Sequence, residues 1–388
     1  MQLRTIRPFS SAHKTHTPPM PPVKPNPSKT LRLLVVCPSW VGDAVMATPA
    51  LRMIRRSMPG IFIGLLCKPG IDEVLAGLDT HDEIHVARPS GVMGPKFIAA
   101  KVRPRRYDTA LLLTNSFSTA LIARIAGIPR RIGYDRDARG MLLTDRLHAP
   151  KRADGSWAPI PACLYYHRAA CALLSIDGHD AEYLPADAQL ELAVTPEQQR
   201  AAEEILASAG VEPGGRVAIL NPGGNNPAKR WPPDRFARVA ERLIEKHGMR
   251  VLVNGAPGER DVISAVINGV REPLRDRCAA LCDMGVNLGS LKGIVRRCSI
   301  MVTNDTGPRH IAGAFGVKLV TLFGPTDHRW TTIPTRPGGE ELVLVADPSL
   351  PTDETANDHP ERCRIERITT ESVIAGVDAL IAAREGGS

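Results

Sequence analysis

Apolar runs and helical patterns alternate along the first half of the chain. Runs of the kind that form buried strands occur at residues 31–37, 61–67, 84–86, 110–113 and 131–134. After the first run, a polar turn leads into a helical pattern that ends near Met58 and contains Pro49, where a proline kinks a helix. Residues 118–126 also have helical spacing. Strands that alternate with helices predict a parallel, doubly wound sheet.

A second alternating series follows residue 195. Thr195, Pro196 and the acidic residues after them are typical of a helix start, so we expect a helix over 195–209. Further strands are expected at 216–220, 250–254, 300–303 and 318–323, and helices at 233–247, up to about 270, at 288–298, 310–315 and 370–384. Residues 326–364 are expected to be rich in loops. The pattern predicts an α/β protein with two Rossmann-like domains that meet near residue 195.

Length and composition agree with two domains and indicate the compartment. A chain of 388 residues exceeds what one hydrophobic core usually holds. The eight cysteines are scattered and lie mostly in apolar contexts, which favours reduced thiols over a disulfide framework. No window approaches the roughly 18 consecutive apolar residues of a membrane span. We therefore expect a cytoplasmic protein.

Residues 1–30 differ from the rest of the chain. They contain five positive charges, no acidic residue, seven prolines and no apolar run of the kind a signal peptide needs. This composition predicts a disordered basic tail. Of the formal net charge of +8, the remaining chain carries only about +3 (8 − 5), so we do not expect the folded part to bind nucleic acid.

A polar turn after the strand expected at 300–303 is the first candidate site. Asp305, Thr306 and Gly307 lie where that strand ends and a helix begins, and His310 follows about one helical turn later. A helix start carries unsatisfied N–H groups and a partial positive charge, so this corner suits a phosphate or pyrophosphate. The alternative is an ordinary N-cap followed by a histidine on the helix surface.

Asp43 is the second candidate, because it lies just after the first strand, at the sheet edge where such folds bind ligands. A free aspartate has a pKa of about 3.9, so it is ionised at neutral pH and can act as a general base for a hydroxyl that becomes acidic as it attacks. The alternative is an acidic residue that only favours the start of its helix.

In the second half of the chain, two more strands are followed by loops that contain glycine or a charged residue. Gly223, Gly224 and Lys229 follow one strand, and Glu259 follows the next, where it can accept hydrogen bonds from a ribose or serve only as a helix-start acid. These loops and the turn at Asp305 converge on one sheet edge, which predicts a nucleotide pocket. The loops contain neither GxxxxGK[ST] nor GxGxxG, and the absence of a paired-aspartate motif predicts catalysis without a metal.

Residues 96–106 hold five cations and no acid. They are interpreted either as a solvated surface or as a lip of the cleft that meets an anionic acceptor or an anionic membrane surface. Arg103, Arg105 and Arg106 are the candidates on the acceptor side.

Five motifs in register resemble the lipopolysaccharide heptosyltransferases, which are inverting GT-B glycosyltransferases. The motifs are PSWVGDAVMATPALR (38–52), NPGGNNPAKRWP (221–232), NGAPGERD (254–261), NDTGPRH (304–310) and LFGPTD (322–327). The similarity covers roughly residues 31–385, and the SWVGD form is closer to the second heptosyltransferase than to the first. This chain departs from the family in its Pro-rich tail, in Pro308-Arg309 and in residues 328–364.

The resemblance implies two facing domains, with the acceptor bound by residues 31–195 and ADP-heptose bound by residues 196–388. It implies that Asp43 is the base, Lys229 meets the donor phosphates, and Glu259 binds the ribose. The turn of Asp305, Thr306 and Gly307 then binds phosphate together with His310, and Trp40 lies on the acceptor side. ADP-heptose would be a substrate, so no cofactor is implied.

The implied acceptor is an anionic saccharide or a lipid-linked saccharide of the lipopolysaccharide inner core, with a peripheral contact to the inner membrane as a further expectation. A glycosyltransferase for another nucleotide sugar and a nucleotide-sugar-binding protein without turnover remain alternatives. A nicotinamide oxidoreductase is disfavoured, because GxGxxG is missing.

Overall fold

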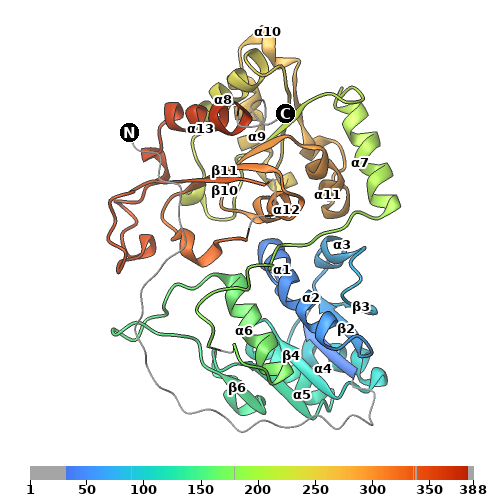
Figure 1. The fold of residues 1–388 in the computed structure, drawn as a ribbon. Helices are drawn as coiled ribbons and strands as arrows, with labels where there is room; N and C mark the ends of the chain where they lie inside the picture. Colours follow the sequence, from blue (N-terminus) through green and yellow to red (C-terminus); the bar gives the residue numbers. More distant parts are fainter. Residues whose placement is uncertain (1–31, 89, 179, 335, 337–338, 383–388) are drawn as a thin grey trace.

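Two six-stranded sheets covered by helices form the protein (Figure 1). The computed structural model describes residues 32–88, 90–178, 180–334, 336 and 339–382, and the basic tail expected at 1–30 lies outside them. The strands are β1 (Arg32–Val36), β2 (Phe62–Cys67), β3 (Glu83–Val86), β4 (Thr109–Leu112), β5 (Arg130–Tyr134), β6 (Asp145–Leu147), β7 (Val217–Asn221), β8 (Arg250–Val253), β9 (Cys278–Ala280), β10 (Ile300–Asn304), β11 (Lys318–Phe323) and β12 (Glu341–Val345).

Both sheets have the same strand order. The first runs β3-β2-β1-β4-β5-β6 and the second runs β12-β11-β10-β7-β8-β9, with every described pairing parallel. Numbered within its own domain, each sheet has the order 3-2-1-4-5-6 of a dinucleotide-binding fold. The direction of winding reverses between β1 and β4 and again between β7 and β10. The predicted doubly wound α/β fold is confirmed.

Helices cover both faces of each sheet. They are α1 (Val41–Met46), α2 (Thr48–Ser57), α3 (Ile71–Leu75), α4 (Gly94–Val102), α5 (Phe117–Ile125), α6 (Ala162–Leu174), α7 (Pro196–Ser208), α8 (Pro233–Glu245), α9 (Arg260–Gly269), α10 (Glu272–Arg275), α11 (Leu288–Arg297), α12 (Gly307–Phe315) and α13 (Thr370–Ala382). The boundary expected near residue 195 falls at the start of α7, which packs on α11. Among the described residues, no helix is long and apolar enough to span a bilayer.

All nine expected strands are present, whereas β6, β9 and β12 are not anticipated. β6 and β9 have three residues each, too few to show a period. β12 is a half-buried edge strand, so residues 326–364 are not only loop. The helical pattern that ends near Met58 forms two helices with a break at Ala47, because Pro49 occupies the first turn of α2.

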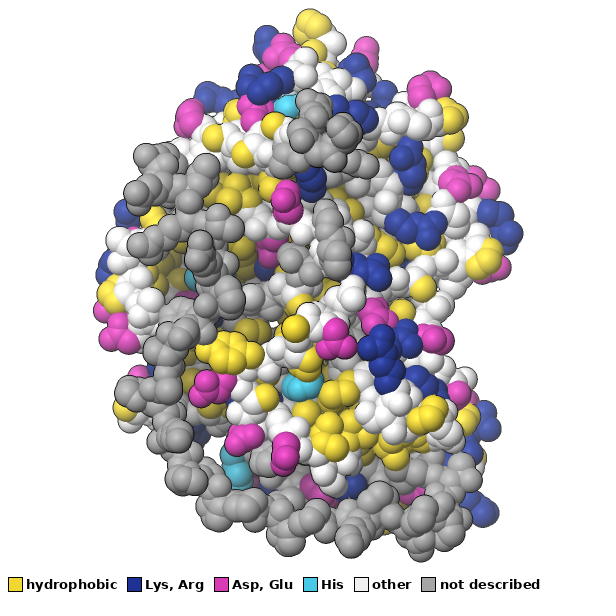
Figure 2. Space-filling model, in the orientation of Figure 1, with side chains coloured by type: hydrophobic (Ala, Val, Ile, Leu, Met, Phe, Trp, Pro, Cys, Tyr) yellow, Lys and Arg dark blue, Asp and Glu magenta, His cyan; other side chains and the backbone are white. Residues whose placement is uncertain are grey.

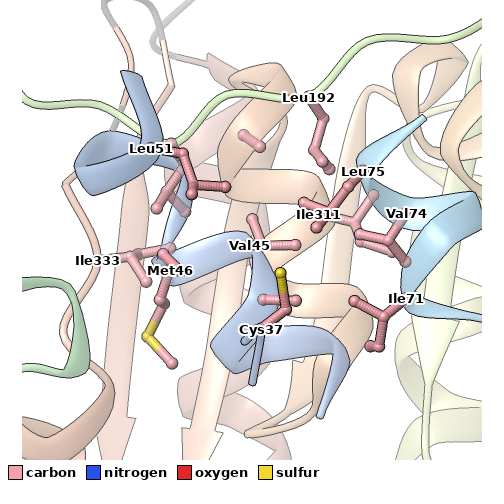
Figure 3. Packing of buried hydrophobic residues seen from close by; sticks show 14 of the residues in the cluster. Cys37, Val45, Met46, Leu51, Ile71, Val74, Leu75, Leu192, Ile311 and Ile333 are labelled. Carbon is pink, nitrogen blue, oxygen red and sulfur yellow. The ribbon is translucent and has the colours of Figure 1, made fainter. Parts of the chain in front are cut away.

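One hydrophobic cluster runs through both domains. It contains Val45 and Leu75 from the first domain and Ile311 from α12 of the second. Figure 3 shows Val45 beside Ile311, with Leu192 and Leu75 close by. The two domains therefore share buried apolar surface where α1 meets α12, which holds the starts of these helices together.

Polar contacts join the domains beside this cluster. The buried Lys292 of α11 donates to the carbonyl oxygens of Val74 and Ala76 at the end of α3, at 3.0 Å each. At the start of α11, the Gly289 N–H donates to the Glu73 carboxylate at 3.0 Å. A cation at the carbonyl end of one helix and an anion at the amino end of the other suit both helix dipoles.

Candidate active site

The polar candidates lie where winding reverses in each sheet. Asp43 is in the first turn of α1, after β1, and Asp305 follows β10. Lys229 ends a short 3-10 helix (Pro227–Lys229) in the loop after β7. Ligands of doubly wound sheets bind outside the carboxyl ends of the strands at such switch points. The fold therefore brings both switch points to one place between the domains.

Two glycines let the starts of α1 and α12 touch. A Cβ added at Gly42 would lie 2.5 Å from His310 Cδ2, and one added at Gly307 would lie 2.9 Å from the Cβ of Val41. Real Cβ atoms do not approach that closely, so a larger residue at either position would push the helices apart. Because of this contact, Asp43 of the first domain lies within electrostatic range of Asp305 of the second.

Asp43 is held by a buried tyrosine. The Tyr166 hydroxyl of α6 donates to Asp43 Oδ1 at 3.0 Å. Desolvation raises the pKa of Asp43 above its ordinary value, the Tyr166 hydrogen bond partly opposes that rise, and the charge of Asp305 adds to it. A carboxylate with a raised pKa is a stronger base, which suits proton removal from a hydroxyl.

Asp305 lies among cations and stays ionised. Lys229 Nζ is 3.1 Å from Asp305 Oδ2, and the buried Arg309 is 3.4 Å from Oδ1. Thr331 also donates to Oδ1, at 3.2 Å. Burial alone would raise the pKa of Asp305, but the charges of Arg309 and Lys229 lower it below the ordinary value. Two neighbouring carboxyl groups thus have pKa values shifted in opposite directions, a pattern that separates a base from a permanent anion.

His310 is buried against Gly42 and is not a histidine on the helix surface. Desolvation, together with the nearby charge of Arg309, lowers its pKa from 6.5 to about 3. The imidazole is therefore neutral at physiological pH, and its Nδ1 has no hydrogen-bond partner within the described part of the chain. A neutral ring does not attract phosphate by charge, so any donor-site role of His310 must rest on hydrogen bonding or on packing.

Thr306 precedes α12 at the N-cap position, but its side chain does not cap the helix. Its Oγ1 instead accepts a hydrogen bond from Asn221 Nδ2 at 2.7 Å. The alternative of an ordinary side-chain cap is therefore wrong. Pro308 has no N–H and the Arg309 N–H donates to the Thr306 carbonyl oxygen at 3.2 Å, so the described contacts of the first turn leave the Gly307 N–H available. An uncapped helix start next to Lys229 favours an anion.

Glu259 ties two loops together. Its Oε1 accepts from the Gly224 N–H at 2.6 Å and its Oε2 accepts from the Ala256 N–H at 2.8 Å. A Cβ at Gly223 would lie 2.3 Å from Oε2, so a larger residue there would displace the Glu259 carboxylate from these hydrogen bonds. Glu259 therefore does more than support a helix start, because it also links two loops. Its contact with a ribose stays a prediction.

The predicted acceptor-side residues separate into two groups. Trp40 precedes α1 and is 64% exposed at the carboxyl edge of the first sheet, close to Asp43. Arg103, Arg105 and Arg106 belong to the turn that precedes β4, so they lie at the amino edge. Arg105 pairs with Glu83 at 2.7 Å, at the start of β3. The interpretation of these arginines as a lip of the cleft is wrong, because a parallel sheet holds its two edges apart.

Comparison with known proteins identifies the family. The sequence model of glycosyltransferase family 9 (heptosyltransferase) matches residues 97–352, more than half of the chain. The chain belongs to glycosyltransferase family 9. It is therefore a glycosyltransferase, and the resemblance to heptosyltransferases drawn from the sequence motifs is confirmed.

Relatives of this family 9 glycosyltransferase cover most of its length. The lipooligosaccharide heptosyltransferase 2 of Haemophilus influenzae is 28% identical over 309 residues, 78% of this chain and 85% of that protein. The structure of E. coli ADP-heptose lipopolysaccharide heptosyltransferase II has a TM-score of 0.74 at 24% identity, covering 92% of this chain and all of that one. An E. coli heptosyltransferase with ADP-2-deoxy-2-fluoro heptose has a TM-score of 0.63 at 16% identity, covering 90% and 99%. These likenesses confirm the GT-B fold.

Several residues of the family 9 site were not anticipated. Tyr166 and Arg309 lie in helices whose patterns did not distinguish them, and Arg309 also pairs with Glu341 of β12 at 2.6 Å. Asparagines end or directly follow three neighbouring strands, and their amides join the strand ends to one another. These are Asn221, Asn254 and Asn304. The repeated asparagine at the ends of successive apolar runs is a signal that the sequence already contains.

Gly42→Ala tests the contact between α1 and α12. Alanine is intrinsically better than glycine inside a helix by roughly 0.5–1 kcal/mol, whereas overpacking costs about 1–3 kcal/mol. We therefore expect a lower Tm together with a lower kcat. Gly60→Ala is the matched control, because nothing lies within 4 Å of the Cβ it adds. Thermal unfolding and steady-state kinetics measure both effects, and wild-type values for Gly42→Ala would show that the helices do not need this approach.

Proposed function

We propose that this glycosyltransferase transfers a heptose from ADP-heptose to an anionic saccharide acceptor of the lipopolysaccharide inner core. The names of its relatives support this acceptor class, and the structure of a heptosyltransferase with ADP-2-deoxy-2-fluoro heptose supports the donor class. Another nucleotide sugar is the main rival donor, because the family description names heptose transfer but no nucleotide. A nucleotide-sugar-binding protein without turnover is not favoured, since the chain belongs to a glycosyltransferase family.

In this proposal the reaction is a single displacement with inversion. The Asp43 carboxylate takes the proton of the acceptor hydroxyl as its oxygen attacks the anomeric carbon. The bond from that carbon to the β-phosphate oxygen breaks, and ADP leaves with the electron pair. Lys229 and the Gly307 N–H at the start of α12 receive the charge that grows on the diphosphate. Asp305 keeps Lys229 in place from the opposite side.

The geometry around the two aspartates carries this assignment: Asp43 accepts from Tyr166 in the first domain and Asp305 pairs with Lys229 in the second, where α1 and α12 touch. Asp43 approaches from the first domain as the stronger base, while Asp305 is a stable anion that orients cations in the second. An ion pair with a purely structural role would require only a stable anion such as Asp305, and no carboxyl group with a raised pKa. A base with a raised pKa beside an uncapped helix start and a lysine fits group transfer to a hydroxyl with an anionic leaving group.

The donor and acceptor are tested by product analysis. The protein is incubated with ADP-heptose and with inner-core saccharides, and the products are weighed by mass spectrometry. We expect a product heavier than the acceptor by one heptose residue. Calorimetry with ADP, UDP and NAD then separates the donor classes, and tighter binding of UDP than of ADP would favour the rival donor.

We expect activity to survive chelation of divalent metals. Lys229 and the start of α12 supply the positive charge that a metal would otherwise bring to the diphosphate. Turnover is measured in EDTA and again after adding magnesium or manganese. A loss in EDTA that either metal restores would contradict the prediction.

We further propose that the enzyme works in the cytoplasm, where a nucleotide sugar is available, without a cofactor of its own. A lipid-linked acceptor would place it next to the inner membrane. Cationic and anionic side chains are interspersed over the face drawn in Figure 2, and we expect no nucleic-acid partner.

A further inference from the structure

Exposed apolar side chains gather at one edge of the first sheet. Eight large hydrophobic residues of the described chain are exposed, and five of them lie on segments that leave the carboxyl ends of β1, β3 and β4. We call these five the rim: Trp40, Val92, Met93, Phe97 and Phe117. The strands are parallel, so all of these segments start from the same edge.

Four of the five rim residues lie at the starts of two helices that pack together. Val92 and Met93 precede α4, Phe97 lies in its first turn, and Phe117 begins α5. The two helices pack side by side and run in the same direction, so their first turns are neighbours. Val92 is 97% exposed and Phe97 is 70% exposed. Exposed apolar side chains grouped in this way mark an interaction surface.

The charges on the segment that carries Val92, Met93 and Phe97 have one sign. Residues 87–101 contain three cations and no acidic residue. Arg88 and Lys96, both exposed, lie among the rim residues at the carboxyl edge, while Lys101 follows further along α4. Apolar side chains interleaved with cations complement a bilayer surface, because the apolar groups enter the acyl boundary and the cations meet anionic headgroups.

We propose that the rim, with Arg88 and Lys96, docks this enzyme on an anionic bilayer. The proposal rests on the proposed function in one respect: the acceptor is taken to be a saccharide anchored in that bilayer. Asp43 lies at the same sheet edge as the rim, so docking there places the acceptor headgroup beside the base. The arginines at the amino edge, which had been expected to meet the acceptor, do not lie at this surface.

Vesicle sedimentation of the full chain tests the surface. The vesicles contain phosphatidylcholine with or without phosphatidylglycerol, and neither donor nor acceptor is added. We expect binding to the anionic vesicles only, weakened by salt. Val92→Ser/Met93→Ser/Phe97→Ser should lower the partition coefficient about tenfold or more, because three apolar groups no longer leave water. Arg88→Gln/Lys96→Gln should lower it by about fivefold for each cation removed.

Ile176→Ser/Tyr183→Ser is the matched control, because these exposed apolar residues lie outside the rim. It should bind vesicles like the wild type. Residues 1–31 are identical in every variant, so any contribution of the basic tail is the same throughout. If the triple variant binds vesicles as the wild type does, or if the wild type does not bind, the proposal is wrong. It is also wrong if the triple variant dissociates a dimer in analytical ultracentrifugation, because the rim would then be covered by a second copy.

Turnover separates this proposal from the proposed function. On a soluble acceptor without lipid, the triple variant should keep its kcat within about twofold, since none of its residues belongs to the proposed catalytic machinery. On acceptor embedded in vesicles, its rate should fall with its binding. Vesicle binding that depends on the rim, without any heptose transfer, would contradict the proposed function and support the docking surface. Heptose transfer by an enzyme whose vesicle binding does not depend on the rim would support the proposed function and contradict the docking surface.

Discussion

Asp43→Asn is expected to cut kcat by about 10²–10⁴ while leaving the affinity for ADP close to that of the wild type. Asparagine keeps the shape of the side chain and can still accept from the Tyr166 hydroxyl, which is 3.0 Å from Asp43 Oδ1. It cannot take a proton from the acceptor. ADP is proposed to bind in the second domain, so its contacts do not include Asp43. Single-turnover rates and calorimetry with ADP measure the two effects separately.

The same substitution should not destabilise the fold at neutral pH. Because burial raises the pKa of Asp43, the folded state binds a proton there more tightly than the unfolded state does. The wild type therefore loses stability as pH rises through that raised pKa, where the buried carboxyl group ionises. Asparagine has no charge to bury, so Asp43→Asn should have an equal or higher Tm at pH 7 and no advantage at low pH. A residue that costs stability but is needed for turnover is typical of a functional site.

Tyr166→Phe is the graded control for this prediction. It removes the hydrogen bond that lowers the pKa of Asp43, so that pKa should rise further and the acid limb of kcat/KM should move to higher pH. The loss of kcat should be smaller than in Asp43→Asn, because the base remains. If Asp43→Asn turned over normally at saturating substrate but no longer bound ADP, Asp43 would belong to the donor site and the assignment to a base would fail.

Most of the predicted strands could be recognised because their apolar runs are long and almost fully buried, as in β1, β7 and β10. β3 is the exception, with four residues of which one is buried. The same reasoning located the three strand ends near which Asp43, Lys229 and Asp305 lie, since polar residues that follow such runs must lie at the carboxyl edge of their sheet. The same reasoning could also have corrected the interpretation of Arg103 as part of the cleft. A residue that precedes a parallel strand lies at the amino edge, away from any ligand, and Arg103 precedes β4.

Contacts between distant segments could not be predicted in this way. Tyr166 is 123 residues from Asp43, and the periodicity of α6 shows only that its face is buried, not which group that face meets. Likewise, Arg309 looked like a departure from a motif, whereas the fold buries it against Glu341, 32 residues further along. The steric requirement for glycine at position 42 is apparent only in the folded structure, where the His310 ring lies beside it.

Lys229→Ala is expected to weaken ADP binding by about 10–100-fold, the usual worth of a hydrogen bond to a charged group. It should also lower kcat, because negative charge grows on the diphosphate as the sugar leaves, and Lys229 then stabilises the transition state more than the ground state. Asp305 would keep Arg309 and Thr331 as partners, so the turn before α12 should stay in place. Lys246→Ala, which removes an exposed cation from the end of α8, is the matched control and should change neither quantity.

The two main variants must therefore fail in different ways if the site lies between the domains. Asp43→Asn should lose the chemical step and keep ADP, whereas Lys229→Ala should lose affinity for ADP and part of the chemical step. In the double variant the losses in kcat should be less than the product of the single losses, because both groups act on one transition state. If Lys229→Ala binds ADP as tightly as the wild type does, the diphosphate does not lie at the start of α12. The pairing of Lys229 with Asp305 at 3.1 Å would then be only a structural contact.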